Sequence, residues 1–250
     1  MNEPAGNRSD VVIDIEQLTR DYQVGFLKKK SVRALDGLTL QVNRGEIFGF
    51  LGPNGAGKTT TLKLLMRLIF PTSGSARILG QSIDDADTHR KIGYLPENPY
   101  FYDYLSGHEL LRYTAALFGI PRDQAEERIA RLLKLVGLAD DAGNRQLRKY
   151  SKGMLQRIGI AQALINDPEV VFMDEPMSGL DPIGRREVRD LLLSLREQRK
   201  TVFFSSHILS DVEALCDRAA ILSRGKLVRC GSVQEMESGG AAAVEVIAIG

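Results

Sequence analysis

The sequence Glu46-Ile-Phe-Gly-Phe-Leu51 leads directly into Gly52-Pro-Asn-Gly-Ala-Gly-Lys58-Thr59, after which leucines recur at helical spacing as far as Phe70. The short apolar run is typical of a buried parallel strand. The glycines let the next segment curl so that successive N–H groups point at one anion, and a helix beginning at about Lys58 adds the positive end of its dipole. This order of strand, glycine-rich loop and helix predicts a phosphate-binding site.

The glycine-rich segment matches the pattern G-x-x-x-x-G-K-[ST], and we call it the phosphate loop (residues 52–59). In such a loop the lysine, here Lys58, reaches the β- and γ-phosphates of a nucleotide, and the hydroxyl of Thr59 can ligate Mg²⁺. The motif therefore predicts a bound nucleotide together with Mg²⁺. The residues expected to contact the nucleotide in this segment are Gly52, Pro53, Asn54, Gly55, Ala56, Gly57, Lys58, Thr59 and Thr60.

Two carboxylates follow a second apolar run, residues 170–173. A buried strand that ends in acids delivers them to the carboxyl edge of the sheet, where the phosphate loop is also expected. Asp174 is suited to hold Mg²⁺. Glu175 can polarise an attacking water as a general base. The alternative is a pair of solvated acids, because Pro176 marks a loop.

A histidine follows a third candidate strand, residues 201–206. His207 is therefore expected at the same edge of the sheet, where an imidazole could contact a γ-phosphate and position water. A lone histidine is more often structural, so the residues alone leave both interpretations of His207 open.

Composition restricts the possible function classes. Lys and Arg total 33 against 32 Asp and Glu, and the formal net charge of +1 gives no electrostatic reason to expect a nucleic-acid partner. The two cysteines, Cys216 and Cys230, form no metal-binding or disulfide pattern. No run of about 18 apolar residues is present, so any membrane-spanning segment would have to come from another chain.

Strands alternate with helices along most of the chain, which predicts a parallel sheet covered on both faces. The first strand is expected at Val11–Glu16 and the second at Val32–Val42, with the basic run Lys28–Lys30 in the loop between them. That run is interpreted as a solvated loop, with contact to lipid headgroups as the alternative. Residues 98–165 are expected to form a helical insert.

Three further segments stand in a recognisable order with those above: Gly93-Tyr-Leu-Pro-Glu97, Tyr150-Ser-Lys-Gly-Met-Leu-Gln-Arg157 and Ser178-Gly-Leu-Asp181. They resemble the Q-loop, the signature and the D-loop of the ABC ATPase family, and the resemblance covers Val11–Glu237. It implies an α/β fold with a P-loop NTPase core, a parallel central sheet, an N-terminal antiparallel β subdomain and a helical insert subdomain. Residues 1–10 are expected to be a disordered tail, and residues 238–250 to begin a C-terminal extension of a longer, truncated protein.

The resemblance also implies a mechanism. In this family two ATP-binding domains pair head to tail, and each ATP lies between the phosphate loop of one domain and the signature of the other. Ser151 and the backbone of Gly153 would then face the partner's γ-phosphate, as a helix N-terminus suits an anion. Glu175 would be the general base, His207 the switch residue and Lys58 the third catalytic group. Tyr22 and Asp181 are expected at the nucleotide as well, Tyr22 stacking on adenine unless it is an ordinary surface tyrosine.

Two departures from the family pattern indicate a subgroup. Glu97 replaces the usual glutamine of the Q-loop, where a carboxylate can still ligate Mg²⁺. Lys152 and Met154 replace the first glycine and the glutamine of the signature, and Lys152 could add a cation beside the partner's γ-phosphate. With both departures the sequence resembles the ATP-binding subunits of type 2 ABC exporters. This resemblance implies a polytopic membrane permease as partner and a peripheral position on the cytoplasmic face of the cell membrane.

Other interpretations remain. A soluble ABC ATPase that acts on translation or DNA is the main alternative, although such proteins usually carry two domains or long coiled coils. An inactive ATP-binding regulator is disfavoured by Glu175 and His207, and a GTPase by the lack of an N-K-x-D motif. The aromatic stretch Asn98–Leu105 borders, by resemblance, the groove for the permease. Packing of these rings in the core of the helical insert is an equal alternative.

Overall fold

The structure is a computed structural model, and it describes residues 10–25, 30–138 and 141–238. The expected disordered tail, except for Asp10, lies outside the described residues. Lys28 and Lys29 of the basic run lie outside them too, as does the expected C-terminal extension from residue 239 onward.

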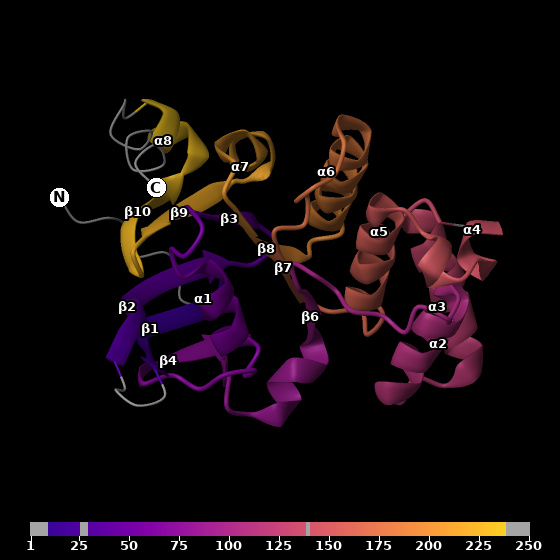
Figure 1. Ribbon diagram of the computed structural model, residues 1–250, viewed down its shortest axis with the longest axis horizontal. Coiled ribbons are helices and arrows are strands. Elements are labelled where there is room, and N and C mark those ends of the chain that lie inside the picture. Colours follow the sequence, from indigo (N-terminus) through magenta and orange to yellow (C-terminus); the bar gives the residue numbers. More distant parts are fainter. Residues whose placement is uncertain (1–9, 26–29, 139–140, 239–250) are drawn as a thin grey trace.

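A parallel sheet forms the centre of the molecule (Figure 1). Within the described residues it has six strands, and only the edge strand β10 is antiparallel to its neighbour. In spatial order the strands are β10 (Lys226–Ser232), β9 (Arg218–Ser223), β3 (Ile47–Leu51), β8 (Thr201–Ser206), β7 (Val170–Asp174) and β6 (Ile92–Leu95).

Both faces of this sheet are buried. Successive side chains of a strand point to opposite faces, so each strand contributes residues to two apolar cores. On β7, Val170 and Phe172 belong to one apolar core, whereas Val171 and Met173 belong to the other. Phe203 of β8 packs on the same side as Phe172, with the rings tilted and their centroids 5.6 Å apart. This two-sided burial explains why the strands read as continuous apolar runs in the sequence.

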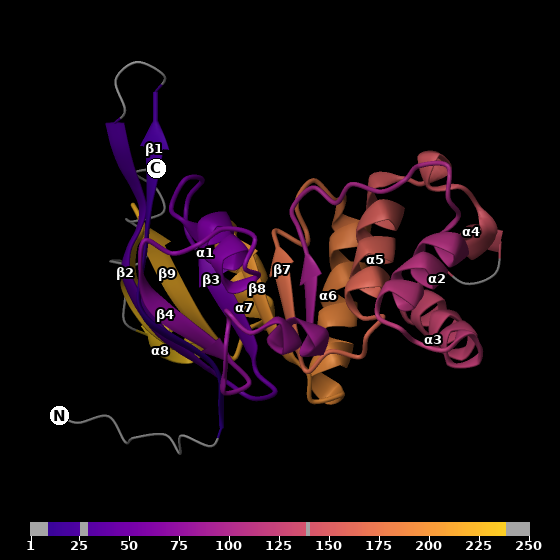
Figure 2. The same cartoon turned by 90° about the horizontal axis from the view of Figure 1, so that it is seen from below.

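An antiparallel sheet covers one side, as the resemblance implies (Figure 2). Its strands are, in order, β2 (Lys30–Asn43), β1 (Val11–Val24), β4 (Ser73–Ile78) and β5 (Gln81–Ser82). The first strand is longer than the expected Val11–Glu16, since the pairing of β1 with β2 continues as far as Val24 opposite Lys30. The outer half of β1 is a strand because it pairs with β2, and its own sequence has no apolar alternation that would predict one.

Helices lie on both faces of the parallel sheet and form the insert. Helix α1 (Lys58–Leu65) packs between the two sheets, because its leucines share a core with strands β1 and β2. Helices α6 (Pro182–Glu197) and α7 (Leu209–Leu215) belong to the core on the other face. The core also carries η1 (Ala86–Lys91) and α8 (Val233–Ser238). The helices of the insert are α2 (Gly107–Leu117), α3 (Arg122–Leu135), α4 (Asp141–Asn144), η2 (Leu147–Lys149) and α5 (Lys152–Ala163). The insert lies at the opposite end of the molecule from the antiparallel sheet (Figure 2). None of the described helices is both long and apolar enough to cross a membrane.

The helix after the phosphate loop is shorter than its leucine spacing predicts. It begins at Lys58 as expected but ends at Leu65 instead of continuing to Phe70. Arg67 adopts a left-handed backbone with φ 54°, which breaks the helix before Pro71. The guanidinium of Arg67 lies 4.5 Å from the ring centroid of Phe70, so the two side chains stabilise this turn.

Gly93 marks a close contact between the insert and the sheet. A Cβ added to this residue of β6 would overlap the carbonyl oxygen of Ala163 at the end of α5. We therefore expect Gly93→Ala to lower the free energy of unfolding by about 1–3 kcal/mol, the usual cost of overpacking. Urea unfolding measures this, with Gly153→Ala as control because a Cβ there meets nothing closer than 3.9 Å. Equal losses in the two variants would contradict the prediction.

Candidate functional site

The phosphate loop passes very close to two neighbouring strands. A Cβ on Gly57, whose φ is 109°, would lie 2.7 Å from the carbonyl oxygen of Ala34 on β2. A Cβ on Gly52 would lie 2.5 Å from the carbonyl oxygen of Leu222 on β9. These positions therefore require glycine, and the loop is held in a fixed shape between the two sheets.

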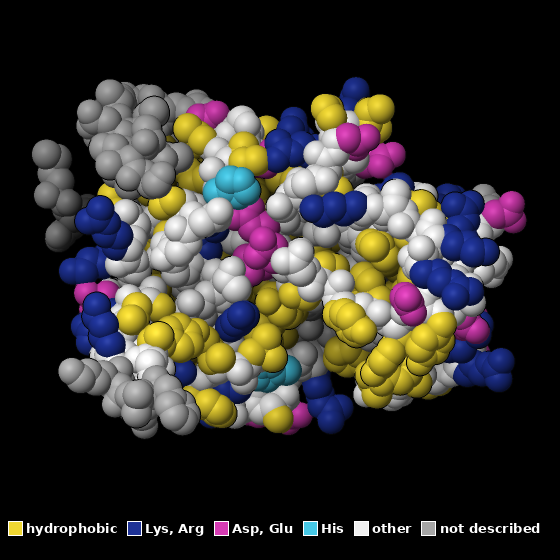
Figure 3. Space-filling view, viewed as in Figure 1, with side chains coloured by type: hydrophobic (Ala, Val, Ile, Leu, Met, Phe, Trp, Pro, Cys, Tyr) yellow, Lys and Arg dark blue, Asp and Glu magenta, His cyan; other side chains and the backbone are white. Residues whose placement is uncertain are grey.

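A cavity of about 500 Å³ opens over the loop and gathers most of the predicted site residues. It lies on the face seen in Figure 3, where acidic side chains occupy the centre with a histidine beside them. We call it the phosphate-loop cavity. Its lining residues are Ala34, Pro53, Asn54, Gly55, Gly57, Lys58, Thr59, Thr60, Glu97, Glu175, Ser178 and His207.

Lys58 is directed back onto the loop and toward the acidic strand end. Its Nζ donates to the carbonyl oxygens of Gly52 at 2.6 Å and Pro53 at 3.3 Å. It also forms an ion pair with Glu175, with Nζ and Oε1 3.3 Å apart and both side chains buried. The cation that would bind phosphate is therefore compensated by the protein's own carboxylate.

Glu175 joins Lys58 to His207. Its second oxygen, Oε2, lies 2.9 Å from Nδ1 of His207, which donates a hydrogen bond when that nitrogen carries the proton. The backbone of Glu175 has φ 51°, a left-handed conformation that is uncommon for a residue with a side chain. Such strain occurs preferentially at functional sites, where the surrounding structure maintains it.

Ser205 is a residue of this site that the sequence analysis did not single out. Its hydroxyl donates to Oδ1 of Asp174 at 2.5 Å and accepts from the backbone N–H of Glu175 at 3.0 Å. Asp174 and Ser205 lie opposite each other on the adjacent parallel strands β7 and β8. A hydroxyl at the end of an otherwise apolar strand is the signal that could have identified it.

The surroundings of Asp174 are almost closed to solvent, since only 1% of the residue is exposed. Burial raises the pKa of nearby Tyr94 to about 12, and the negative charge of Asp174 contributes to the shift. The phenol therefore stays neutral and protonated at any physiological pH.

The acidic strand end fits the ligand preferences of Mg²⁺. Asp174 Oδ2 is buried and has no hydrogen-bond partner among the described residues. Within that part of the chain no group of three or more His, Cys, Asp or Glu side chains could hold a metal without other ligands. Mg²⁺ is usually held by one or two carboxylates together with substrate phosphates. The orphaned oxygen, with the hydroxyl of Thr59 on the cavity wall, suits that arrangement.

Several predicted residues do not line this cavity. Tyr22 lies on β1 opposite Val32, and the guanidinium of Arg20 covers its ring at 4.7 Å from the centroid. Asp181 is the N-cap of α6 and accepts from the N–H of Gly184 at 2.8 Å. Gly52, Ala56 and Asp174 are also absent from the cavity wall, and Ala56 and Asp174 are buried.

The signature residues also lie outside the cavity. Ser151 is the N-cap of α5 and accepts from the N–H of Met154 at 3.2 Å, so Lys152 and Gly153 form the first turn of that helix. A Cβ on Gly179 would overlap Nζ of Lys152. The lysine of the signature therefore rests on the turn that follows Ser178, a residue of the cavity wall.

Comparisons with known proteins agree with this geometry. The sequence pattern of the family described as ABC transporter matches residues 35–178. An uncharacterised ABC transporter ATP-binding protein of Synechocystis is 54% identical over 226 residues, which cover 90% of this chain and 64% of the relative. The chain thus spans less than two thirds of that protein's length.

Two similar proteins have a named cargo. A bacitracin transport ATP-binding protein of Bacillus licheniformis is 44% identical over 79% of this chain and 64% of its own length. A fluoroquinolones export ATP-binding protein of Mycobacterium tuberculosis is 40% identical over 90% of this chain and 72% of its own length.

Among solved structures, a dimeric ATP-binding cassette in a post-hydrolysis state bound to ADP and Pi superimposes with a TM-score of 0.79. It is 26% identical, and the match covers 88% of this chain and 98% of that one. The ordered motifs, the phosphate-loop cavity and these matches lead to one conclusion. The chain belongs to the family of ABC transporter ATP-binding proteins.

Proposed function

We propose that this chain binds and hydrolyses ATP as the energy-supplying subunit of a membrane exporter. The observation that carries the proposal is the phosphate-loop cavity, in which Lys58, Glu175 and His207 meet. Anion-binding backbone, a cation, a candidate base and a candidate positioning group lie within one cavity, as ATP hydrolysis requires.

Binding begins at the loop. The N–H groups at the start of α1 and the ammonium of Lys58 provide the positive charge for the β- and γ-phosphates. Because Lys58 is paired with Glu175 in this structure, the arriving phosphates would take over that ammonium and release the carboxylate. Release of Glu175 by the substrate itself would couple occupancy of the site to availability of the base.

The hydrolytic step then falls to Glu175 and His207. The released carboxylate can accept a proton from a water that attacks the γ-phosphorus. His207, already 2.9 Å from Glu175, can hold that water and the γ-phosphate in line. Ser205 fixes the backbone of Glu175 through its N–H, so the base has a defined starting position.

Mg²⁺ would be held by Asp174 and Thr59, with Glu97 as a further oxygen ligand from the cavity wall. When bound, it would neutralise charge on the β- and γ-phosphates. Tyr22 on β1 would stack on adenine once the side chain of Arg20, which covers its ring, moves away.

A second ATP-binding domain would complete the site. The N-terminus of α5, with Ser151 and Gly153, does not line this chain's own cavity and suits the γ-phosphate of a partner. Lys152 and Asp181 would lie at the same contact. The dimeric state of the solved cassette with ADP and Pi supports this pairing.

A membrane partner would dock on the side of the insert. A groove of about 390 Å³ lies between the end of α1, the segment after β6 and helices α2 and α5. Tyr100, Tyr102 and Tyr104 beside it are 93%, 51% and 60% exposed, so the core-packing alternative is wrong for the tyrosines. It holds for Phe101, which packs against the core. Hydrophobic side chains gather over this part of the molecule (Figure 3), as an interface requires.

Export is favoured by the relatives with named cargo, which are described as bacitracin transport and fluoroquinolone export proteins. The proposed position is on the cytoplasmic face of the cell membrane, beside a polytopic permease. The test is to tag the full-length protein, isolate it from detergent-solubilised membranes and identify by mass what co-purifies. We expect a stoichiometric polytopic membrane protein. Recovery from the soluble fraction alone, or with ribosomes or DNA, would overturn the exporter proposal.

Glu97 provides a test of the metal-binding part of the proposal. We expect Glu97→Gln to bind ATP as the unmodified protein does but to need a different Mg²⁺ concentration for half-maximal turnover, because an amide oxygen carries no charge. Titration of hydrolysis against Mg²⁺ at saturating ATP measures this. An exposed acid outside the cavity, Glu127, gives the control variant Glu127→Gln. Superimposable Mg²⁺ curves for all three proteins would mean that Glu97 does not approach the metal.

A further inference from the structure

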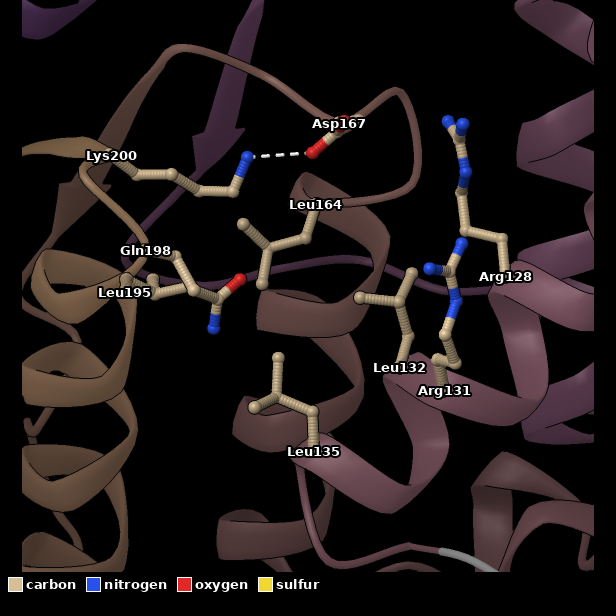
Figure 4. Close-up of a pocket in the computed structure, with 9 residues that line it drawn as sticks. All are labelled: Arg128, Arg131, Leu132, Leu135, Leu164, Asp167, Leu195, Gln198 and Lys200. Atoms are coloured by element: carbon tan, nitrogen blue, oxygen red, sulfur yellow. Dashed lines mark hydrogen bonds and ion pairs between the residues drawn. The ribbon is translucent and has the colours of Figure 1, made fainter.

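A second cavity, which shares no lining residue with the phosphate-loop cavity, lies between the helical insert and the core (Figure 4). Its volume is about 270 Å³, just under the range of about 300–1,000 Å³ for drug-sized ligand pockets. We call it the α3–α6 cavity. It is lined by Arg128, Arg131, Leu132, Leu135, Leu164, Asp167, Leu195, Gln198 and Lys200.

The cavity is at the opposite edge of the parallel sheet from the nucleotide. Lys200 immediately precedes β8, whereas His207 of the phosphate-loop cavity immediately follows it. Asp167 similarly precedes β7. A ligand in the α3–α6 cavity would therefore not overlap a bound nucleotide.

The interior of this cavity is apolar. Leu132, Leu135 and Leu164 point into it from the α3 and α5 side, and Leu195 closes it from α6 (Figure 4). Leu195 is fully buried, and Leu132 and Leu164 are buried beneath the surface. The leucines provide a dry floor that suits a hydrocarbon group.

The rim of the cavity is positively charged. Arg128, Arg131 and Lys200 stand against the single carboxylate of Asp167 among its lining residues. Lys200 is already engaged, since its Nζ donates to Asp167 Oδ1 at 2.7 Å and to the carbonyl oxygen of Pro168 at 2.8 Å. Arg128 donates one bond, from Nη1 to the carbonyl oxygen of Ile165 at 2.8 Å, which leaves its other N–H donors available.

Arg131 is the cation that has no protein acceptor. No hydrogen bond or ion pair joins it to any side chain or carbonyl in the described part of the chain, and it stands beside Arg128 on the α3 wall (Figure 4). The positive charges act across the cavity: the pKa of Asp167 lies below its usual value, chiefly through its hydrogen bond with Lys200, with the charges of Arg128 and Arg131 contributing. The cations that line the cavity therefore outnumber its carboxylates, and a bound anion would balance the excess positive charge.

We propose that the α3–α6 cavity binds a small amphipathic carboxylate, with the head group on Arg131 and Arg128 and the hydrocarbon chain on the four leucines. A guanidinium binds a carboxylate through two parallel N–H bonds, which a lysine in the same place would not provide. The volume suits a chain of medium length. Since α3 belongs to the insert and α6 to the core, such a ligand contacts both.

The test uses octanoate as the probe, with 1-octanol and acetate as the uncharged and chain-free comparisons. We expect saturable binding of octanoate by calorimetry, with affinity at least about tenfold above that of either comparison, since a charge-assisted pair and the apolar floor both contribute. Leucine-methyl NMR should show shifts at Leu132, Leu135, Leu164 and Leu195. Binding with no selectivity over 1-octanol, or shifts confined to other leucines, would overturn the proposal.

Two variants on the same helix distinguish the site from general charge effects. Arg131→Gln removes the unpartnered cation, and we expect it to weaken octanoate binding by about tenfold. Lys134→Gln removes an equal charge from an exposed position of α3 that does not line the cavity, and it should change binding less than about twofold. Saturating ATP should leave octanoate affinity unchanged. Competition with ATP, or equal loss in both variants, would contradict the assignment.

Discussion

We expect the Lys58→Ala variant to bind ATP at least about a hundredfold more weakly than the unmodified protein, since charge-assisted bonds to phosphate are the strong ones. Lys58 provides the only lysine or arginine side chain on the wall of the phosphate-loop cavity within the described residues. Its loss also leaves Glu175 with one charge partner fewer in a buried setting. Phosphate and carboxylate would then repel each other without a cation between them.

Calorimetry or a fluorescent ATP analogue measures this affinity. Because Glu175 loses a buried partner, the unfolding free energy of Lys58→Ala should fall too, and binding is measured well below its melting transition. Lys63→Ala is the matched control, as Lys63 is an exposed lysine on the same helix. If Lys58→Ala and Lys63→Ala bind ATP equally well, the phosphate-loop assignment is wrong.

Glu175→Gln should have the opposite pattern, with ATP binding retained and turnover lowered by about 10²–10⁴-fold, the usual contribution of a general base. The amide is nearly the same size and can still accept from His207, but it cannot take a proton from water. It also no longer neutralises Lys58, so ATP affinity should rise rather than fall. With hydrolysis blocked, ATP should hold two domains together.

Steady-state hydrolysis, ATP titration and gel filtration with and without ATP measure the three effects. Glu127→Gln again serves as the control for a lost carboxylate on the surface. A Glu175→Gln variant that hydrolyses ATP at the unmodified rate would remove Glu175 from the role of base. Weaker ATP binding in this variant would show that the Lys58–Glu175 pair does not compete with phosphate.

The parts of the fold that could be predicted from sequence are those with a local cause. A buried strand, a glycine loop and a helix follow one another between residues 46 and 65, so the phosphate loop can be recognised without knowing its neighbours. The carboxyl edge of a parallel sheet then brings Glu175 and His207 to the same place. The structure gathers both in one cavity with Lys58.

The remainder depends on contacts between distant segments. The outer half of β1 exists because β2 pairs with it, and the early end of α1 depends on a left-handed turn at Arg67 that leucine spacing cannot reveal. Ser205 gains its role only from its register beside Asp174 on the next strand. Ser151 and Asp181 cap helices in this chain and do not line the phosphate-loop cavity, so their roles at a nucleotide stay predictions.

The two-sided burial of β7 and β8 has a consequence for how the molecule loses its activity on heating. Amides in such strands exchange with solvent only when the whole domain opens. Glu175 and His207 directly follow these strands, so they are anchored to fully buried strands of the parallel sheet. We therefore expect the base–histidine geometry to be lost on heating together with global unfolding and not before it.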